Sequence, residues 1–114
     1  MSLYANYINE SKGNTVVEDE MGFYEYSLKE ECLYIENAYI IPECRGNNNG
    51  KKYMVQMAEI AKAFDLYQLT GVVNVKHLNA NYLMDLYLKN GGNVILAQND
   101  NIYFTISVKD ALKL

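Results

Sequence analysis

The chain has 114 residues, half of them hydrophobic, and a formal net charge of −4. This length supports a modest core, so we expect one domain over residues 1–114. The acidic balance argues against a nucleic-acid partner or an anionic membrane. No apolar run reaches the roughly 18 residues that a membrane helix needs, and no signal peptide opens the chain. We therefore expect a soluble, cytoplasmic protein.

Residues 15–20, 23–28 and 32–42 are predicted to form three strands that follow one another as an antiparallel meander. Eleven tyrosines dominate the aromatic content, and tyrosine suits half-buried strands. Residues 29–31, Lys-Glu-Glu, make a polar connection between the second and third strands. Pro42 is expected to end the third strand because proline cannot donate to a sheet ladder.

The two cysteines, Cys32 and Cys44, lie at the two ends of the third predicted strand. At about 3.3 Å per residue, an extended strand would hold them beyond the reach of a disulfide. Neither has a Cys or His nearby at the spacing of metal ligands. We expect two reduced cysteines, in a reducing compartment, and no metal site.

A helical period begins after the asparagine-rich segment. Met54, Met57, Ala58 and Ala61 recur at the spacing of one helix face, which predicts an amphipathic helix of about 14 residues. Residues 69–75 are nearly all apolar or β-branched, as is typical of a central strand buried on both faces. The order strand, helix, strand indicates a right-handed parallel crossover.

The last third of the chain contains a second predicted helix and a hairpin. Residues 79–89 form the helix, with Asn79 or Asn81 as its N-cap and Asn90-Gly91-Gly92 as its stop. Residues 93–98 and 101–108 form two strands joined at Asn99-Asp100. The expected fold class is therefore α/β (α+β) with a mixed sheet: an antiparallel meander, one βαβ unit, a helix and a C-terminal β-hairpin.

The loop at residues 45–50, Arg-Gly-Asn-Asn-Asn-Gly, lies between a strand and a helix start. The first amides of a helix are unpaired and its dipole is positive there, so this arrangement can bind phosphate. Glycine and asparagine tolerate left-handed backbone, and Lys51 and Lys52 add positive charge. A polar turn capped by Asn49 or Gly50 is the alternative. From these residues alone the turn is favoured, because the loop has neither P-loop nor dinucleotide-fold spacing.

Two segments of the sequence resemble motifs of the GNAT superfamily of N-acetyltransferases. "YIIPECRGNNNGKKYM" resembles the motif in which an apolar strand runs into a proline and then [Q/R]-x-x-G-x-[G/A], with Arg45, Asn48 and Gly50 at the motif positions. "LMDLYLKNGG" resembles the later LY-x-K-x-GF segment. The order of elements agrees from about residue 15 to residue 110. The chain is identified as a short member with its N-terminal helices reduced or absent.

The resemblance implies a V-shaped gap between the strand that ends at Pro42 and the strand at residues 69–75, with acetyl-CoA bound in that gap. Backbone groups of Ala38, Tyr39 and Ile40 would pair with the pantetheine arm. An asparagine at the second helix, Asn79 or Asn81, would contact the same arm. The pyrophosphate would lie on the backbone amides of seven consecutive residues: Arg45, Gly46, Asn47, Asn48, Asn49, Gly50 and Lys51.

The resemblance also implies acid and base residues. Tyr87 matches the family tyrosine that gives a proton to the departing thiolate and lies beside the cofactor; alternatively it is a core tyrosine. Glu36 lies where many members carry a base or a water-holding carboxylate; alternatively it faces solvent. Asn74 stands where some relatives place a glutamate, and asparagine is no base. The only histidine, His77, is a second base candidate.

The implied function is transfer of an acetyl group from acetyl-CoA to a primary amine by direct attack, which makes the protein an acyltransferase. The acceptor stays open between a peptide N-terminus, a lysine, a polyamine and a small antibiotic-like amine. One alternative is a non-catalytic domain of the same fold that binds CoA or serves as a structural subunit. A weaker alternative is an unrelated α/β interaction module. Strand faces left bare by reduced N-terminal helices would favour a homodimer.

Overall fold

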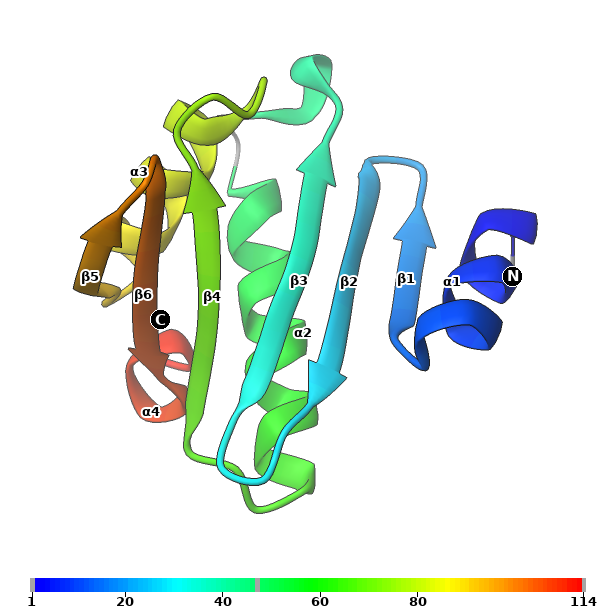
Figure 1. Cartoon of the computed structure of the whole chain (residues 1–114), viewed down its shortest axis with the longest axis horizontal. Coiled ribbons are helices and arrows are strands. Elements are labelled where there is room, and N and C mark those ends of the chain that lie inside the picture. The colour runs from blue at the N-terminus through cyan, green and yellow to red at the C-terminus, as the bar shows by residue number, and fades with distance from the viewer. Residues whose placement is uncertain (1, 47, 114) are drawn as a thin grey trace.

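The structure is a computed structural model that describes residues 2–46 and 48–113. Six strands form one sheet in the order β1-β2-β3-β4-β6-β5, as Figure 1 shows. The strands are β1 (Thr15–Asp19), β2 (Gly22–Leu28), β3 (Leu33–Ile40), β4 (Gln68–Asn74), β5 (Asn93–Gln98) and β6 (Asn101–Ser107). The helices are α1 (Leu3–Lys12), α2 (Asn49–Ala63), α3 (Ala80–Lys89) and α4 (Val108–Ala111), with a short 3₁₀ turn at Pro42–Cys44.

The meander β1-β2-β3 is antiparallel, as predicted. The third strand ends at Ile40 rather than at Pro42. Pro42 instead takes the first position of the 3₁₀ turn, where its fixed φ and missing N–H are tolerated. This early end of β3 turns the chain out of the sheet just before the loop at residues 45–50.

The βαβ unit is present: β3 and β4 are parallel and α2 connects them. The four apolar residues that predicted α2 are all at most 1% exposed, and they face the sheet. The prediction that β4 is buried on both faces is wrong. Leu69, Gly71 and Val73 are buried, whereas Thr70 and Val72 are half-buried. The reason is visible in Figure 1: α2, α3 and α4 all lie behind the sheet, and no described helix covers the front of β3 and β4.

The two remaining helices differ from the predictions. The last strand ends at Ser107, not at residue 108, because the Ser107 hydroxyl caps α4 by accepting the Asp110 amide N–H at 3.0 Å. Helix α1 was not predicted. Its N-cap is Ser2, whose hydroxyl accepts the Ala5 amide N–H at 2.9 Å. Among the described residues, one helix of 10 residues precedes β1.

The core lies between the back of the sheet and the three helices behind it. Its largest buried side chains include Tyr24, Phe104, Leu33, Met54 and Ile106. A smaller cluster joins α1 to the front of β1 through Ala5, Ile8 and Val16. The mixed α/β class, the parallel crossover and the hairpin are therefore confirmed. Within residues 2–46 and 48–113 no helix has the length and apolarity needed to cross a membrane.

Candidate functional site

Strands β3 and β4 separate along their length. They pair only from Leu33–Leu69 to Ile35–Gly71, and beyond this point they diverge, as the cyan and yellow-green arrows of Figure 1 show. The divergence begins at a β-bulge, because Glu36 is an extra residue of β3 between the pairs Tyr26–Ile35 and Glu25–Asn37. We call the space between the diverging ends of β3 and β4 the wedge.

Two carbonyls of β3 that face the wedge accept hydrogen bonds from side chains of the protein itself. The Asn79 amide Nδ2 donates to the Ala38 carbonyl at 3.3 Å, and the Arg45 Nε donates to the Ile40 carbonyl at 2.8 Å. Each of these side chains keeps one buried atom, Asn79 Oδ1 and Arg45 Nη2, that has no hydrogen-bond partner among the described residues. Buried polar groups without partners are rare, so a ligand with both a donor and an acceptor would complete this arrangement.

A cavity of about 250 Å³ lies in the wedge. Leu83 and Tyr87 of α3 line it, while Glu36 and Asn37 of β3 line it together with His77. The Tyr87 ring is 2% exposed and stacks on Phe104 with 4.1 Å between ring centroids. Burial raises the pKa of the Tyr87 hydroxyl above its ordinary value, with a further contribution from Tyr82. Tyr87 therefore holds its proton throughout the neutral range.

The two base candidates lie at the surface of the same cavity. Glu36 is exposed, and one of its carboxylate oxygens accepts the Ser27 hydroxyl at 2.9 Å. His77 is also exposed, and its Nδ1 accepts the Asn79 amide N–H at 3.4 Å. Asn74 lines the cavity and donates to the Asn101 side chain at 3.1 Å. A water molecule or an amine can reach both Glu36 and His77 from solvent.

Among the described residues of the loop at 45–50, left-handed backbone occurs at two positions. Gly46 has a φ of 90° and Asn48 a φ of 61°, which glycine and asparagine adopt most readily. The N-cap position of α2 is Asn48 rather than Asn49 or Gly50, and its side chain makes no capping hydrogen bond. The Asn49 side chain instead donates to the Cys44 carbonyl at 2.8 Å. Predicted site residue Asn47 lies outside the described residues.

The start of α2 packs closely against α3. A Cβ atom placed on Gly50 would lie 2.5 Å from the Tyr82 hydroxyl and 2.9 Å from the Leu86 side chain. Burial raises the pKa of the Tyr82 hydroxyl, and Arg45 and the nearby Gly50 backbone amide partly offset that rise. The Tyr82 hydroxyl therefore lies where it can compete with an anion for a backbone donor of the loop.

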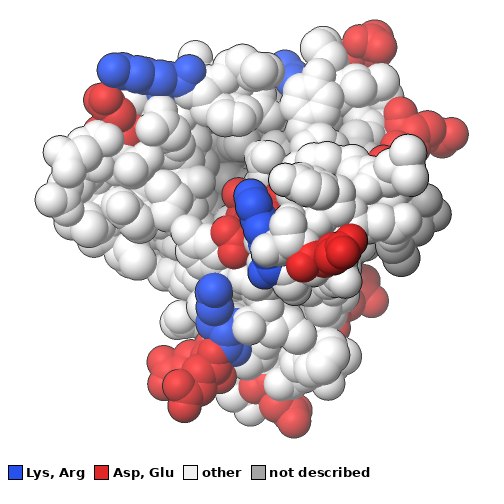
Figure 2. Space-filling view, turned by 45° about the vertical axis from the view of Figure 1, so that its right-hand side comes forward, with Lys and Arg blue, Asp and Glu red and all other residues white. Residues whose placement is uncertain are grey.

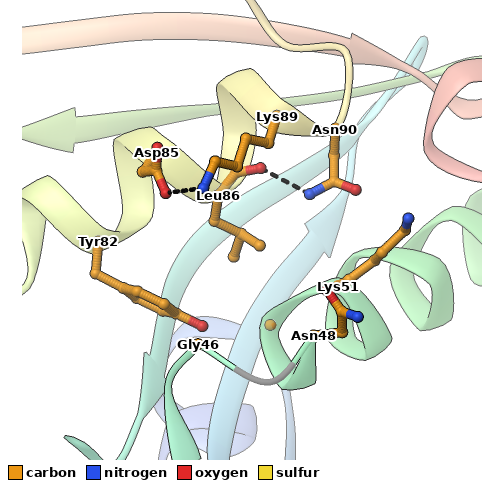
Figure 3. Close-up of a pocket in the computed structure, with 9 residues that line it drawn as sticks. Gly46, Asn48, Lys51, Tyr82, Asp85, Leu86, Lys89 and Asn90 are labelled. Carbon is orange, nitrogen blue, oxygen red and sulfur yellow. Dashed lines mark hydrogen bonds and ion pairs between the residues drawn. The ribbon is translucent and has the colours of Figure 1, made fainter.

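A second cavity, of about 290 Å³, lies beside this contact, and we call it the loop cavity (Figure 3). The chain lines it with Gly46, Asn48 and Gly50 on one side and with Tyr82, Leu86 and Asn90 on the other. Lys51 and Lys89 bring positive charge, and Lys89 Nζ pairs with Asp85 at 2.9 Å.

Arg45 connects the loop cavity to the wedge. Its guanidinium carbon lies 5.6 Å from the centroid of the Tyr39 ring and 5.3 Å from that of the Tyr82 ring. These are distances at which a cation is attracted to an aromatic face. The side chain is therefore held between β3 and α3, over the carbonyl of Ile40.

Crystal structures of acetyltransferases share this architecture. The PaiA N-acetyltransferase from Thermoplasma acidophilum in complex with coenzyme A aligns with a TM-score of 0.72 and 17% identity, over 92% of this chain and 68% of that one. A GNAT family acetyltransferase from Elizabethkingia anophelis with acetyl-CoA bound gives 0.66 and 13%, over 90% and 82%. An acetyltransferase from Bacillus subtilis in complex with CoA gives 0.63 and 13%, over the same shares, 90% and 82%. No protein-family profile and no curated protein matches the sequence.

The chain has the GNAT fold.

Within this GNAT fold, the predicted site residues fall into two groups. Tyr87, Glu36, His77 and Asn79 meet at the wedge, together with the carbonyl of Ala38. Gly46, Asn48, Gly50 and Lys51 line the loop cavity instead. Asn81, the alternative to Asn79, is exposed in the first turn of α3. The structure brings Asn79, not Asn81, to β3, although the Asn79 side chain makes no capping hydrogen bond to the helix.

Sequence reasoning missed Tyr82, which contacts both Gly50 and Arg45 in this GNAT fold. A signal for it exists. Tyr82 and Leu86 are four residues apart, so a helix places them on one face, and that face meets the start of α2. Asn37 and Asn101 were missed because only the folded sheet brings them to the wedge cavity.

Proposed function

We propose that the protein transfers an acetyl group from acetyl-CoA to a primary amine by direct attack. The observation that carries this proposal is the wedge: two parallel strands that separate at a bulge, with carbonyls of Ala38 and Ile40 facing the gap and Tyr87 lining it. Crystal structures of this fold that contain CoA or acetyl-CoA support the choice of donor.

The residues present fit acetyl-CoA as the cofactor. Asn79 Oδ1 is a buried acceptor without a partner, and Arg45 Nη2 is a buried donor without one, among the described residues. An amide-bearing arm and a pyrophosphate offer those complementary groups. The Gly46, Asn48 and Gly50 backbone with Lys51 would hold the pyrophosphate at the start of α2. Bound acetyl-CoA would supply the thioester whose acyl group is transferred.

Tyr87 would serve as the general acid. Its hydroxyl keeps a proton because burial raises its pKa, and it would give this proton to the departing sulfur. Glu36 or His77 would take the proton that the acceptor ammonium must lose before its neutral amine attacks the thioester carbonyl, directly or through water, because both side chains are exposed at the wedge cavity. The helices α2 and α3 close the back of the wedge, so the amine would enter from the front.

Two measurements test this function. Coenzyme A should raise the melting temperature by mass action, by several degrees at concentrations far above its Kd. Acetyl transfer to an amine should fall at least tenfold in Tyr87→Phe, a typical loss for removing an acid, with CoA binding retained. If CoA binds but no amine is acetylated, the non-catalytic alternative holds. If millimolar CoA produces no shift, both the enzyme and any CoA-binding version of that alternative are wrong.

We also propose a cytoplasmic homodimer. Cys32 and Cys44 are both free thiols, which suits a reducing compartment. Strand β5 is exposed at all six residues, and Val94, Ile95 and Leu96 are 49%, 62% and 49% exposed. This segment carries no charge, and natural edge strands usually carry one to prevent pairing. A second copy would cover it. Ile95→Lys should then lower the mass measured by light scattering at micromolar protein to that of one chain. If the wild-type protein is itself a monomer, the proposed dimer is wrong, but the proposed acetyl transfer is unaffected.

A further inference from the structure

Two residues of β3, Ala38 and Ile40, turn their polar backbone groups towards the wedge. The next residue, Ile41, donates its N–H to the Met21 carbonyl at 2.8 Å, so it pairs on the side of β2. Backbone groups of successive residues in a strand point to opposite sides, and those of Ile40 and Ala38 therefore point away from β2. The pairing of β3 with β4 has already ended at Ile35. These backbone groups consequently need other partners.

Two asparagine side chains supply the partners of Ala38. Oδ1 of Asn37 accepts the Ala38 N–H at 2.9 Å, and Nδ2 of Asn79 donates to the Ala38 carbonyl at 3.3 Å. One asparagine is therefore the acceptor and the other is the donor, which are the two roles that a neighbouring strand would fill. A ligand arm that contains amide groups also offers acceptors. The Asn37 side chain thus occupies a donor that a carbonyl of such an arm could use.

The two asparagines differ in how firmly they are held. Asn79 is 2% exposed and takes the N-cap position of α3, 41 residues along the chain from Ala38. Asn37 is half-buried, lines the cavity of about 250 Å³, and directly follows the bulge residue Glu36. Bulges re-aim the side chains beside them, and a change of rotamer turns a side chain without moving its backbone. Asn37 is therefore the partner that can leave Ala38.

A ligand arm reaches Asn37 from the front of the sheet. The helices α2, α3 and α4 lie behind the sheet in Figure 1, whereas Figure 2 shows a hollow in the surface on the opposite side. Uncharged side chains form most of the surface to the left of this hollow in Figure 2. Covering a charge costs more than covering a neutral polar group that finds a partner, so this approach suits a neutral amide arm.

We propose that Asn37 is a gate on the donor site: its Oδ1 holds the Ala38 amide until a carbonyl of the acyl donor's arm replaces it. This inference rests on the proposed binding of acetyl-CoA and adds a residue that limits the affinity for it. The product CoA has the same arm as acetyl-CoA, so the gate weakens the binding of both. Because product release limits turnover in many enzymes, a side chain that competes with the arm favours turnover.

The same hydrogen bond has a second possible role, the protection of an unpaired strand edge. The two roles predict different results for Asn37→Ala. If Asn37 only protects the edge, the variant loses stability and gains no affinity, because a partner of a partly buried N–H is removed. If Asn37 is a gate, the variant binds CoA more tightly, because the ligand no longer has to displace a competitor.

Calorimetric titration with CoA tests the gate. In Asn37→Ala the affinity should rise by about two- to tenfold, the size of one neutral hydrogen bond, and CoA should dissociate more slowly by a similar factor. Asn37→Asp keeps an acceptor at this position, and a charged acceptor holds an N–H more strongly, so affinity should fall several-fold. ADP has the pyrophosphate but no pantetheine arm, and its affinity should be equal in the wild type and Asn37→Ala. The ADP affinity of Asn37→Asp measures any long-range repulsion of the pyrophosphate.

Hydrogen exchange of the Ala38 amide, followed by NMR, gives a readout that needs no ligand. The exchange should be several-fold faster in Asn37→Ala than in the wild type, and bound CoA should slow it in both proteins. Asn93→Ala is the matched control. Asn93 is also a strand asparagine whose side chain bonds to nearby backbone, the Gly91 carbonyl at 3.4 Å, but it lies on β5 at the edge of the sheet. Its CoA affinity and its Ala38 exchange should equal those of the wild type.

An unchanged or lower CoA affinity in Asn37→Ala would overturn the gate and leave the proposed transferase intact. The gate is also wrong if ADP gains as much affinity as CoA, because the effect would then not act through the arm. Unchanged exchange of the Ala38 amide in Asn37→Ala would overturn it as well. If CoA binds neither the wild type nor any variant, the proposed function fails, and the gate fails with it.

Discussion

The loop cavity and the wedge differ in how their polar groups are built. In the loop cavity the backbone groups are contiguous in the chain, and one donor, the Gly50 amide, lies beside the Tyr82 hydroxyl. In the wedge the groups are carbonyls of β3. The Ala38 carbonyl is satisfied by Asn79, a residue 41 positions away, and the Ile40 carbonyl is satisfied by Arg45 of the loop itself. The loop cavity therefore depends on local backbone shape, whereas the wedge also depends on long-range placement, and Arg45 joins the two.

The largest effect is expected for a substitution that disrupts the loop cavity and leaves the wedge intact. In Gly50→Val the added side chain meets the Tyr82 hydroxyl and Leu86, because even its Cβ would lie 2.5 Å and 2.9 Å from them. We expect CoA affinity to fall by about 100-fold or more, and the melting temperature to fall by several degrees. Calorimetric titration and thermal unfolding measure the two.

The double variant Gly50→Val with Tyr82→Ala serves as the control for that clash. Removing the Tyr82 ring makes room for the valine, so the melting temperature should partly recover. If Gly50→Val binds CoA as the wild type does, the loop does not hold the pyrophosphate.

A smaller effect is expected in the wedge. Asn79→Ala removes the amide that satisfies the Ala38 carbonyl and the orphan Oδ1 acceptor. Leaving a buried group unpaired costs about 1–3 kcal/mol, so CoA affinity should fall by roughly tenfold and stability should also decrease. Asn81→Ala is the matched control: an asparagine two residues away, exposed, expected to be neutral in both titration and melting. Equal losses in the two variants would contradict the assignment of Asn79.

Tyr82 gives a prediction with opposite signs in two variants. Tyr82→Phe removes the hydroxyl that lies beside the Gly50 backbone while keeping the ring that faces Arg45. Without this competing oxygen the Gly50 amide is open to an anion, so CoA affinity should rise by about two- to fivefold, the size of one neutral hydrogen bond. Tyr82→Ala removes the ring as well, loosens Arg45, and should lower affinity. Titration of both variants decides; a loss in Tyr82→Phe would mean that its hydroxyl contacts the ligand instead of competing with it.

The smallest effect concerns pH. Burial raises the pKa of Tyr87 above its ordinary value of about 10, so its proton stays in place as the pH rises through that value. Above pH 10 Tyr87 ionises in the unfolded chain before it does so in the folded protein. Its contribution to the free energy of unfolding is therefore complete below about pH 10 and is lost as the pH rises further. The single-turnover rate of acetyl transfer should show no decline due to Tyr87 between pH 8 and about 10. A titration near pH 8 that disappears in Tyr87→Phe would contradict this.

The elements that sequence predicted are those fixed by short-range spacing. Met54 and Met57 identify a helix because they are three residues apart on a long apolar face. The loop after Pro42 could be predicted because its residues are contiguous in the chain. Helix α1 was not predicted because it buries only Ala5 and Ile8, and two apolar positions are too few to define an amphipathic helix face.

The wedge could be predicted only in outline. Asn79 and Asn81 are equivalent in sequence, and the choice between them is made by the Ala38 carbonyl, 41 residues earlier in the chain. The burial of β4 failed as a prediction for a similar reason: β-branched residues indicate a strand, but which faces are covered depends on where every helix packs.

The bulge at Glu36 has a consequence for how such a chain diversifies. Buried positions of β3 fall at Leu33 and Ile35, then at Ala38 and Ile40, so the extra residue shifts the alternation by one. The gap between β3 and β4 is thus encoded by the number of residues in the strand rather than by the identity of any side chain. A substitution scan of β3 would pass over it. A single-residue deletion at Glu36 would restore regular alternation along β3 and remove the bulge at which β3 leaves β4, so a deletion scan is the way to find it.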